Sequence, residues 1–317
     1  MNYIGSKRKL APHIFREIHS IVPQGIFCDI FAGTGAVSEK FASEYQLIVN
    51  DWEDYSYIIN YQKFGPYVAD QQTLTKINYL NSLEGVEGFI FDNYSLNGGR
   101  MYFTEENAAK IDAIRFEIDE IGDSSIERQY LTALLLAAAD KVANVASVYG
   151  AYLKNFKTTA SKPIYLKDLP KFCSDAFVYC KDANDYTWRG DVAYLDPPYN
   201  TRHYGSNYHM LNTITNYNYF EPKGITGLPE YKKSSYCSKP KIRPAFEELL
   251  AKIECEHIFI SYNNEGILSQ TDFEEICSKY GKLTTIVLDA EYQRFKADSK
   301  RNQAAESTTE FLYHIQK

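Results

Sequence analysis

The sequence predicts an α/β protein built on a doubly wound sheet, with a helical insertion and an antiparallel terminal hairpin. Three observations lead to this prediction. An apolar run at 25–31 is followed by a turn, a helical pattern at 36–45 and a second apolar run at 46–50, the order that begins a doubly wound sheet. From about 65 to 165 strand signals are scarce. Short strand patterns then return and continue toward the end of the chain.

The other elements follow from apolar spacing and local signals. Residues 6–22 have the apolar spacing of a helix. Thr104 followed by two glutamates predicts a helix start, and a second, mostly apolar helix is expected from about 125 to 150. The remaining strands are expected at 175–180, 192–195, 257–262, 284–289 and 308–315. A polar, basic segment joins the last two, which predicts the antiparallel hairpin.

Composition favours an intracellular protein that does not enter a membrane. The chain has 317 residues, 44% of them hydrophobic, so it can bury a full core. No signal-peptide pattern is found, and the most apolar run, LTALLLAAAD, is too short to cross a bilayer. The six cysteines form no CxxC pair and no histidine stands at ligand spacing. This pattern indicates reduced thiols, and neither disulfides nor a metal site.

The charge of the chain is unevenly distributed. The net charge is −7, yet residues 1–16, 141–167 and 229–243 carry four, five and five Lys or Arg against a single acid. Each run alone is typical of a solvated face. Three of them in one acidic chain indicate a polarised surface suited to nucleic acid.

The first predicted strand ends in DIFAGTG, whose Gly33 and Gly35 allow the backbone to pass close to a ligand. In a doubly wound sheet, ligands bind at the carboxyl ends of the strands, at this first crossover. The second strand ends at Asp51, where an acid can bind both hydroxyls of a ribose. A glycine turn alone also serves tight packing, and Asp51 alone could cap a helix or turn. A nicotinamide oxidoreductase fits these residues equally well.

The stretch DVAYLDPPYN distinguishes between these chemistries. Two successive prolines exclude helix and remove two backbone donors, so the strand stops and presents Asp196, a rigid carbonyl and the ring of Tyr199. An exocyclic amine conjugated to a purine is a poor nucleophile because its lone pair is delocalised. A carboxylate and a fixed carbonyl that accept both N–H hydrogens favour its pyramidal form, and an aromatic ring stacks on the base. Methyl transfer to such an amine then depends on positioning.

With these residues in view, the chain resembles the Dam-like alpha group of adenine-N6 DNA methyltransferases, in particular those of restriction–modification systems. The resemblance is carried by NYIGSKRKL, DIFAGTG and DPPYN in that order around an inserted block, and by RHYGSNYH and FISYNNEGIL. It implies a Rossmann-like fold that uses S-adenosylmethionine (SAM). Residues 1–64 and 166–317 would form the catalytic domain, and residues 65–165 a helical target-recognition insertion.

The resemblance also implies roles for individual residues. Lys7 would pair with the carboxylate of SAM, and Asp51 would bind its ribose. The implied cofactor contacts are Tyr3, Lys7, Asp29, Phe31, Gly33, Gly35, Asp51, Asp182 and Asp196. The implied catalytic residues are Asp196, Pro197, Pro198 and Tyr199. Asn212 stands where an acid is expected, and it is assigned no role.

A base in duplex DNA must be flipped out of the helix before its amine can react. Residues that directly follow the catalytic motif are expected to contact a phosphate or fill the vacated stack, although each alone could be a surface polar residue: Arg202, His203, Tyr204 and His209. The basic runs supply further expected contacts with the DNA backbone, at Lys154, Lys157, Lys232 and Lys233.

The expected function is methyl transfer from SAM to N6 of adenine within a specific short sequence of double-stranded DNA, as the modification enzyme of a restriction–modification system. S-adenosylhomocysteine is the expected product, and no metal or membrane is expected to take part. The expected partners are double-stranded DNA and, functionally rather than physically, a cognate restriction endonuclease. The expected location is the cytoplasm, at the nucleoid through DNA. The alternatives are adenine-N6 methylation of RNA, a glutamine methyltransferase, a nicotinamide oxidoreductase and an inactive DNA-binding module.

Overall fold

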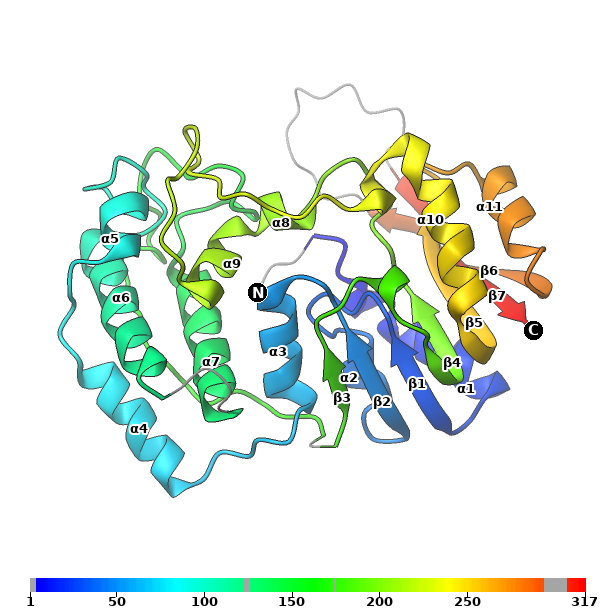
Figure 1. The fold of residues 1–317 in the computed structure, drawn as a ribbon, viewed down its shortest axis with the longest axis horizontal. Helices are drawn as coiled ribbons and strands as arrows, with labels where there is room; N and C mark the ends of the chain where they lie inside the picture. The colour runs from blue at the N-terminus through cyan, green and yellow to red at the C-terminus, as the bar shows by residue number, and fades with distance from the viewer. Residues whose placement is uncertain (1–3, 122–125, 174, 294–306) are drawn as a thin grey trace. The chain divides into compact units, whose positions relative to one another are not determined.

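The computed structural model describes residues 4–121, 126–173, 175–293 and 307–317 (Figure 1). The chain forms two compact units. The sheet unit comprises Ser6–Trp52, Tyr179–His203 and Lys233–Lys317. The helical unit comprises Met1–Gly5, Glu53–Val178 and Tyr204–Lys232. The domain boundaries expected from the sequence stay predictions, and the compact helical unit is larger than the expected insertion.

The described residues form a seven-stranded sheet in the order β3-β2-β1-β4-β5-β7-β6. The strands are β1 (Gly25–Asp29), β2 (Tyr45–Asn50), β3 (Phe177–Tyr179), β4 (Arg189–Leu195), β5 (Glu254–Asn263), β6 (Lys282–Gln293) and β7 (Ser307–Gln316). β1 pairs in parallel with β2 and β4, and β4 pairs in parallel with β5. β7 lies antiparallel between β5 and β6, which confirms the predicted terminal hairpin. The chain order reverses between β1 and β4, as in a doubly wound sheet.

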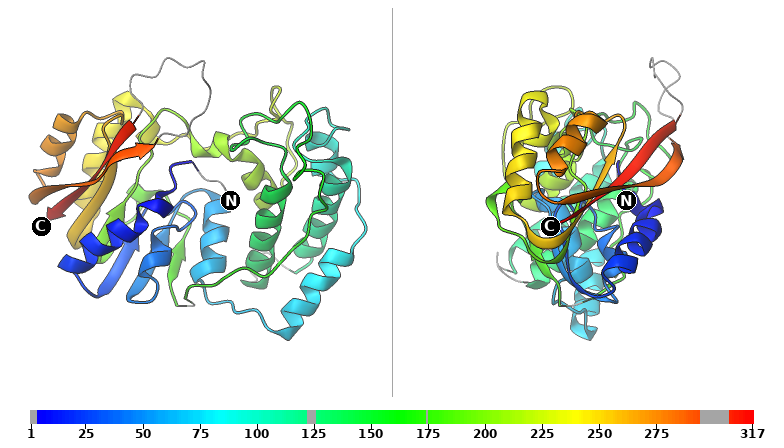
Figure 2. Two further views of the ribbon diagram at one scale, coloured as in Figure 1. Left: turned by 180° about the vertical axis from the view of Figure 1, so that it is seen from behind. Right: turned by 90° about the vertical axis from the view of Figure 1, so that its right-hand side faces the viewer.

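Helices cover both faces of this sheet. α10 (Lys239–Lys252) and α11 (Gln270–Cys277) lie on one face and α1 (Ala11–Ile21) on the other (Figure 2). The shorter helices of the unit are η1 (Lys7–Lys9), α2 (Ser38–Phe41), η2 (Ala183–Asp185) and η3 (Ser235–Cys237). The helix predicted at 36–45 is thus shorter than expected, because β2 already begins at Tyr45. Phe41 of α2 stacks on Phe27 of β1 with ring centroids 3.8 Å apart, so this short helix still anchors the core.

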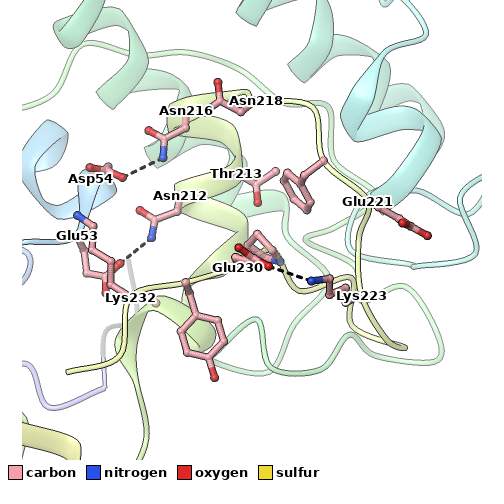
Figure 3. Close-up of a pocket in the computed structure, with 14 residues that line it drawn as sticks. Glu53, Asp54, Asn212, Thr213, Asn216, Asn218, Glu221, Lys223, Glu230 and Lys232 are labelled. Carbon is pink, nitrogen blue, oxygen red and sulfur yellow. Dashed lines mark hydrogen bonds and ion pairs between the residues drawn. The ribbon is translucent and has the colours of Figure 1, made fainter. Parts of the chain in front are cut away.

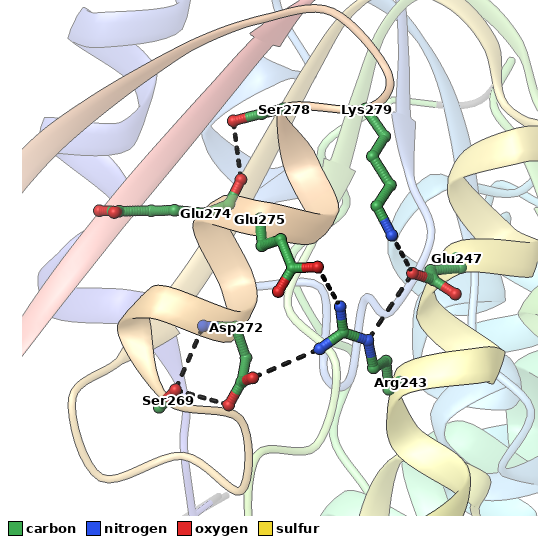
Figure 4. A network of polar contacts seen from close by, with 8 residues as sticks. All are labelled: Arg243, Glu247, Ser269, Asp272, Glu274, Glu275, Ser278 and Lys279. Carbon is green, nitrogen blue, oxygen red and sulfur yellow. Dashed lines mark hydrogen bonds and ion pairs between the residues drawn. The ribbon is translucent and has the colours of Figure 1, made fainter.

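Polar contacts join α10 to α11 at the surface (Figure 4). The guanidinium of Arg243 forms ion pairs with Asp272 at 3.3 Å and Glu275 at 2.9 Å. Glu247 pairs with Arg243 at 3.8 Å and with Lys279 at 2.9 Å. Exposed ion pairs contribute little to stability one by one, so the apolar contacts beneath carry most of this packing.

The helical unit contains α3 (Asp54–Phe64), α4 (Gln71–Ser82), α5 (Phe89–Tyr94), α6 (Glu105–Asp119), α7 (Ile126–Val142), α8 (Tyr204–Asn207) and α9 (His209–Asn216). Thr104 is the predicted N-cap of α6, and its hydroxyl accepts a hydrogen bond from the Asn107 amide at 3.2 Å. α7 ends earlier than the expected limit near residue 150. Its end is followed by irregular backbone that Asn144 holds through the carbonyls of Met101 and Leu153. Within the described ranges, no helix has the length and apolar character that crossing a membrane requires.

Gly190 of β4 is needed for close packing inside the sheet unit. A Cβ at this position would lie 3.0 Å from both the Cys28 sulfur and the Ile26 carbonyl oxygen on β1. The strand cannot move away, because Gly190 is also paired with Cys255 of β5. We therefore expect Gly190→Ala to lower the free energy of unfolding by roughly 1–3 kcal/mol through overpacking.

Urea denaturation followed by tryptophan fluorescence measures this effect in the sheet unit, because Trp52 and Trp188 both belong to it. The control is Gly150→Ala in the helical unit, where an added Cβ meets no atom within 4 Å. It should leave the same transition unchanged. An unchanged transition in Gly190→Ala would show that the strands can separate to admit a methyl group.

Candidate active site

The carboxyl ends of β1, β2 and β4 bring the glycine turn and Asp51 together. Gly33 and Gly35 have φ angles of +54° and +74°, a region that favours glycine. The Gly33 amide donates to Oδ2 of Asp51 at 2.8 Å. Asn50, which is buried, donates to the carbonyls of Ile30 and Lys181 at 3.0 and 3.1 Å. The turn after β1 is therefore fixed to the end of β2 by two neighbouring side chains.

Asp29 is a buried carboxylate at the end of β1. Its Oδ2 accepts a hydrogen bond from the Ser38 hydroxyl at 2.6 Å. Its Oδ1 has no hydrogen-bond partner among the described residues. Burial raises the pKa of Asp29 to about 7, although the bond from Ser38 opposes this shift. Asp29 is thus a buried acceptor with one oxygen available to a ligand.

Asp196, which follows β4, belongs to a buried charge cluster. Nζ of Lys7 lies 3.0 Å from Oδ1 of Asp196 and 2.8 Å from Oε1 of Glu310 on β7. The side chains of Lys7 and Glu310 are 5% and 3% exposed, and that of Asp196 is 17% exposed. Asp196 is therefore the one carboxylate of the pair that keeps a face toward solvent.

Burial and charge act in opposite directions on the pKa values of this cluster. Burial raises the pKa of Asp196 to about 6, while the Lys7 ammonium lowers it and Glu310 raises it further. For Lys7, burial acts to lower the pKa, but the carboxylates of Asp196 and Glu310 outweigh it and hold it well above its usual range. Lys7 is thus a permanent cation that favours the ionised form of Asp196.

The Pro-Pro-Tyr stretch continues from Asp196 as irregular backbone. Pro197 is buried, and Pro198 and Tyr199 are partly exposed. The Tyr199 ring lies with its centroid 5.2 Å from Nζ of Lys7 and packs edge-on against Tyr262 at 6.2 Å. Its carbonyl accepts from the Ile267 amide at 3.0 Å. The ring is therefore held beside the carboxylate that precedes it.

Three other expected cofactor residues differ in what their positions support. Phe31 is half-buried and packs edge-on against Tyr236 at 5.1 Å. Asp182 caps η2 through the Asn184 amide at 3.0 Å, which is the bonding of a turn residue. Tyr3 lies outside the described residues.

The expected DNA contacts of the sheet unit lie at or near its surface. Arg202 and Lys233 are exposed. His203 is partly buried, and its Nδ1 accepts from the Ser234 amide at 3.2 Å. Burial and the charge of Lys233 lower the pKa of His203, so it is neutral at physiological pH.

Among the expected DNA contacts of the helical unit, His209 is placed where it cannot fill that role. It is fully buried in the apolar core, and its Nε2 lies 3.0 Å from the Tyr149 carbonyl. Burial lowers its pKa to about 4, so it carries no charge for a phosphate. Lys154 and Lys232 are exposed, and Lys157 bonds the Val145 carbonyl through Nζ at 2.8 Å.

Tyr204, the remaining expected contact of this unit, is partly buried. Its hydroxyl donates to the Ile4 carbonyl at 3.1 Å, and its ring stacks on Tyr208. These contacts hold it within the helical unit.

Asn212, to which the sequence assigns no role, joins α9 to the start of α3 (Figure 3). Its Nδ2 donates to Glu53 at 2.6 Å, and its Oδ1 accepts from the Tyr55 amide at 3.1 Å. One turn further on, Asn216 donates to Asp54 at 2.9 Å. These pairs border a cavity of about 480 Å³ within the helical unit. The amide thus replaces the expected acid because its partner, Glu53, is itself a carboxylate.

Glu310 is the principal site residue that sequence reasoning missed. It is the acid in the apolar strand TTEFLYHI, and an acid on a buried strand is the signal that could have marked it. Among the described residues, no cluster of three or more His, Cys, Asp or Glu could hold a metal ion.

Comparisons with known proteins agree with this site. The profile of the D12 class N6 adenine-specific DNA methyltransferases matches residues 3–276. The chain is 45% identical to Type II methyltransferase M.NlaIII of Neisseria lactamica, over all of this chain and 99% of that protein. It is 38% identical to Type II methyltransferase M.CviAII of Paramecium bursaria Chlorella virus 1, over 99% of this chain and 98% of the relative. Type II methyltransferase M.FokI of Planomicrobium okeanokoites is 36% identical over all of this chain, which spans 53% of that protein.

The matched family acts on adenine in DNA, so the RNA and nicotinamide alternatives are not supported. Its profile covers the glycine turn, Asp51 and the Asp-Pro-Pro-Tyr stretch in one continuous match. The chain therefore belongs to the D12 class N6 adenine-specific DNA methyltransferases.

Proposed function

We propose that this DNA methyltransferase is the modification enzyme of a Type II restriction–modification system and methylates adenine N6 within a short, specific duplex sequence. The observation that carries the chemical part is Asp196, a carboxylate held by Lys7 at the end of a buried strand and followed by two prolines and a tyrosine. The names of the relatives as Type II methyltransferases support the biological part. The endonuclease would share the recognition sequence without binding the enzyme, and both would act in the cytoplasm.

Asp196 and the Pro197 carbonyl would accept the two hydrogens of the adenine amine. The amine nitrogen then becomes pyramidal and directs its lone pair at the methyl group. A C–N bond forms as the C–S bond breaks, and the nitrogen afterwards loses one proton. Since these acceptors are fixed before the reaction, no reorganisation is needed in the transition state. Pro198 would keep the backbone rigid, and the Tyr199 ring would stack on the base.

Lys7 would act on Asp196 and not on the carboxylate of the cofactor. Its Nζ already lies on Asp196 and Glu310, which differs from the role implied by the resemblance. A cation at this distance favours ionised Asp196, and only the ionised carboxylate accepts both in-plane hydrogens from donors without donating one itself. We therefore assign Lys7 as a positioning residue that maintains the charge of Asp196.

The residues at the strand ends fit SAM, which supplies an electrophilic methyl group on a sulfonium. SAM presents an ammonium and two ribose hydroxyls as donors. Oδ1 of Asp29 is a buried acceptor without a partner among the described residues, and Asp51 stands at the end of the adjacent strand. We assign the methionine end to Asp29, Phe31, Gly33 and Gly35, the ribose to Asp51 and the adenine end to Asp182. Tyr3 stays an expectation from the sequence.

The exposed basic residues would contact the DNA backbone without reading its sequence. We assign this role to Arg202, Lys154, Lys232 and Lys233. His203, Tyr204 and Lys157 are partly buried and would contribute only at the edge of such a surface. His209 is excluded from it by its burial.

Transfer of labelled methyl from SAM to unmethylated genomic duplex DNA tests the proposed function. Nucleoside analysis should find the label in N6-methyladenine, and sequencing should place it in one short motif. Methylation at unrelated adenines would contradict a modification enzyme of a restriction–modification system. DNA methylated in this way should resist an endonuclease that cuts at the same motif.

Asp196→Ala should lower kcat by at least roughly 10²-fold, because one of two preorganised acceptors is lost. The binding of SAM should change little, since Asp29 and Asp51 are untouched. Single-turnover methylation and calorimetric titration with SAM measure the two effects. Glu39→Ala, which removes a carboxylate paired with Arg8 at the surface of the same unit, is the matched control and should keep its activity. Near-normal turnover in Asp196→Ala would refute its assignment.

The pH dependence of kcat/KM should report Asp196. Its pKa in the folded protein is raised from 3.8 to about 6 and the ionised form is the active one, so activity should fall as the pH drops through about 6. An unperturbed aspartate would keep its activity in that range. Lys7→Met removes the cation that favours ionisation and should move this inflection to higher pH.

The matched control is Lys9→Met, an exposed lysine of the same short helix η1. It should leave the inflection in place. If Lys7→Met lowered kcat/KM equally at every pH, Lys7 would serve the fold or the cofactor and not the ionisation of Asp196.

A further inference from the structure

The turn at residues 222–228 of the helical unit is unusually well fixed for an irregular segment. Lys223 and Leu228 face each other as an antiparallel bridge, with both amide–carbonyl hydrogen bonds formed at 3.0 and 2.8 Å. Gly224 and Gly227 have φ angles of +69° and +68°, which let the chain reverse between them. A Cβ at Gly227 would lie 2.8 Å from the Tyr94 ring, so the turn is packed directly on the unit.

Side chains from outside the turn hold its backbone carbonyls. Arg100 donates to the carbonyls of Pro222 and Gly224 at 3.4 and 3.2 Å. The hydroxyl of Tyr94 donates to Gly227 at 2.7 Å, and that of Tyr102 donates to Thr226 at 3.2 Å. Both tyrosines are fully buried. The tip of the turn therefore has little freedom to bend away when it is pressed against another molecule.

Ile225 stands at the tip of this fixed turn. Its side chain is 82% exposed, more than that of any other large apolar residue among those described. An aliphatic side chain displayed in this way gains nothing in the isolated protein, because its burial would be favourable. Rigid support of an exposed apolar tip indicates that the tip enters an apolar environment in the functional complex.

We propose that Ile225 is a wedge that inserts between neighbouring bases of the DNA substrate. The inference rests on the proposed function, in which a base must leave the stack before it reacts. Proteins that kink or open DNA insert aliphatic or aromatic side chains into a base step, and isoleucine is among those used. The wedge fills the gap between unstacked bases, which offsets part of the cost of opening the duplex.

The charges beside the tip favour the base stack over a phosphate as its target. Lys223 is paired with Glu230 at 3.1 Å, and Glu221 is a further exposed acid (Figure 3). These flanks have no excess of positive charge to attract the DNA backbone. A protein partner is also disfavoured, because one aliphatic side chain at a turn offers far less area than a stable interface buries.

The experiment uses the full-length protein and a duplex that carries its mapped methylation site. Ile225→Ser removes the apolar tip and leaves the anchoring bonds, which all go to backbone carbonyls. It should lower kcat/KM on the paired duplex roughly tenfold or more, while Ile225→Leu keeps most of the rate. Val68→Ser, at a 63% exposed aliphatic residue of the same unit, is the matched control and should change nothing.

2-Aminopurine placed at each position of the site in turn locates the step that opens. The wild type should show a rise in fluorescence at that step which Ile225→Ser lacks. A mismatch at the same step removes the need for a wedge and should restore most of the lost rate. Thermal unfolding and SAM binding should match the wild type in every variant.

Three results would overturn the wedge: full activity in Ile225→Ser, an equal loss on paired and mismatched duplexes, or a change of mass in sedimentation showing that the tip holds a second copy of the chain. A wild type that methylates no DNA would instead refute the proposed function. The two failures are therefore distinguishable.

Discussion

A lysine buried between two carboxylates joins distant parts of the chain at one point. Lys7 comes from η1, Asp196 from the end of β4 and Glu310 from β7. Three charges can leave water only if they are paired, and loss of one partner would leave an uncompensated buried charge. The start, the middle and the end of the sheet unit must therefore assemble in one arrangement. That arrangement also places a cation on the proposed catalytic carboxylate, so folding and chemistry depend on the same contact.

Rigidity recurs around the groups to which we assign chemical work. β4 is paired on both sides, by β1 and β5, and two prolines restrict the backbone that follows it. In the helical unit, buried tyrosines and an arginine fix the carbonyls of an irregular turn. In both places the supporting contacts are made within the folded protein before any ligand arrives. Preorganisation of this kind removes an entropic cost from binding and from the transition state.

The fold class was predictable because its signals are local. Alternation of apolar residues marked every strand of the sheet, and the glycines after β1 marked the crossover. The cap at Thr104 depends on residues within one turn of helix, and it was found at the predicted position. The ends of elements were less predictable. α2 stops at Phe41 and α7 at Val142, because neighbouring segments compete for the same backbone.

By itself the sequence determined the order of the strands along the chain, the glycine turn and the rigid Asp-Pro-Pro-Tyr stretch, since each depends on residues adjacent in the chain. Only the tertiary structure decided which side chains meet. It paired Lys7 with Glu310, buried His209 and joined Asn212 to Glu53. These outcomes depend on the register of β7 between its neighbours and on how α9 packs against α3, which are contacts between residues far apart in the sequence. No local spacing encodes such distances, so the chemistry was predictable from the motifs but the charges that sustain it were not.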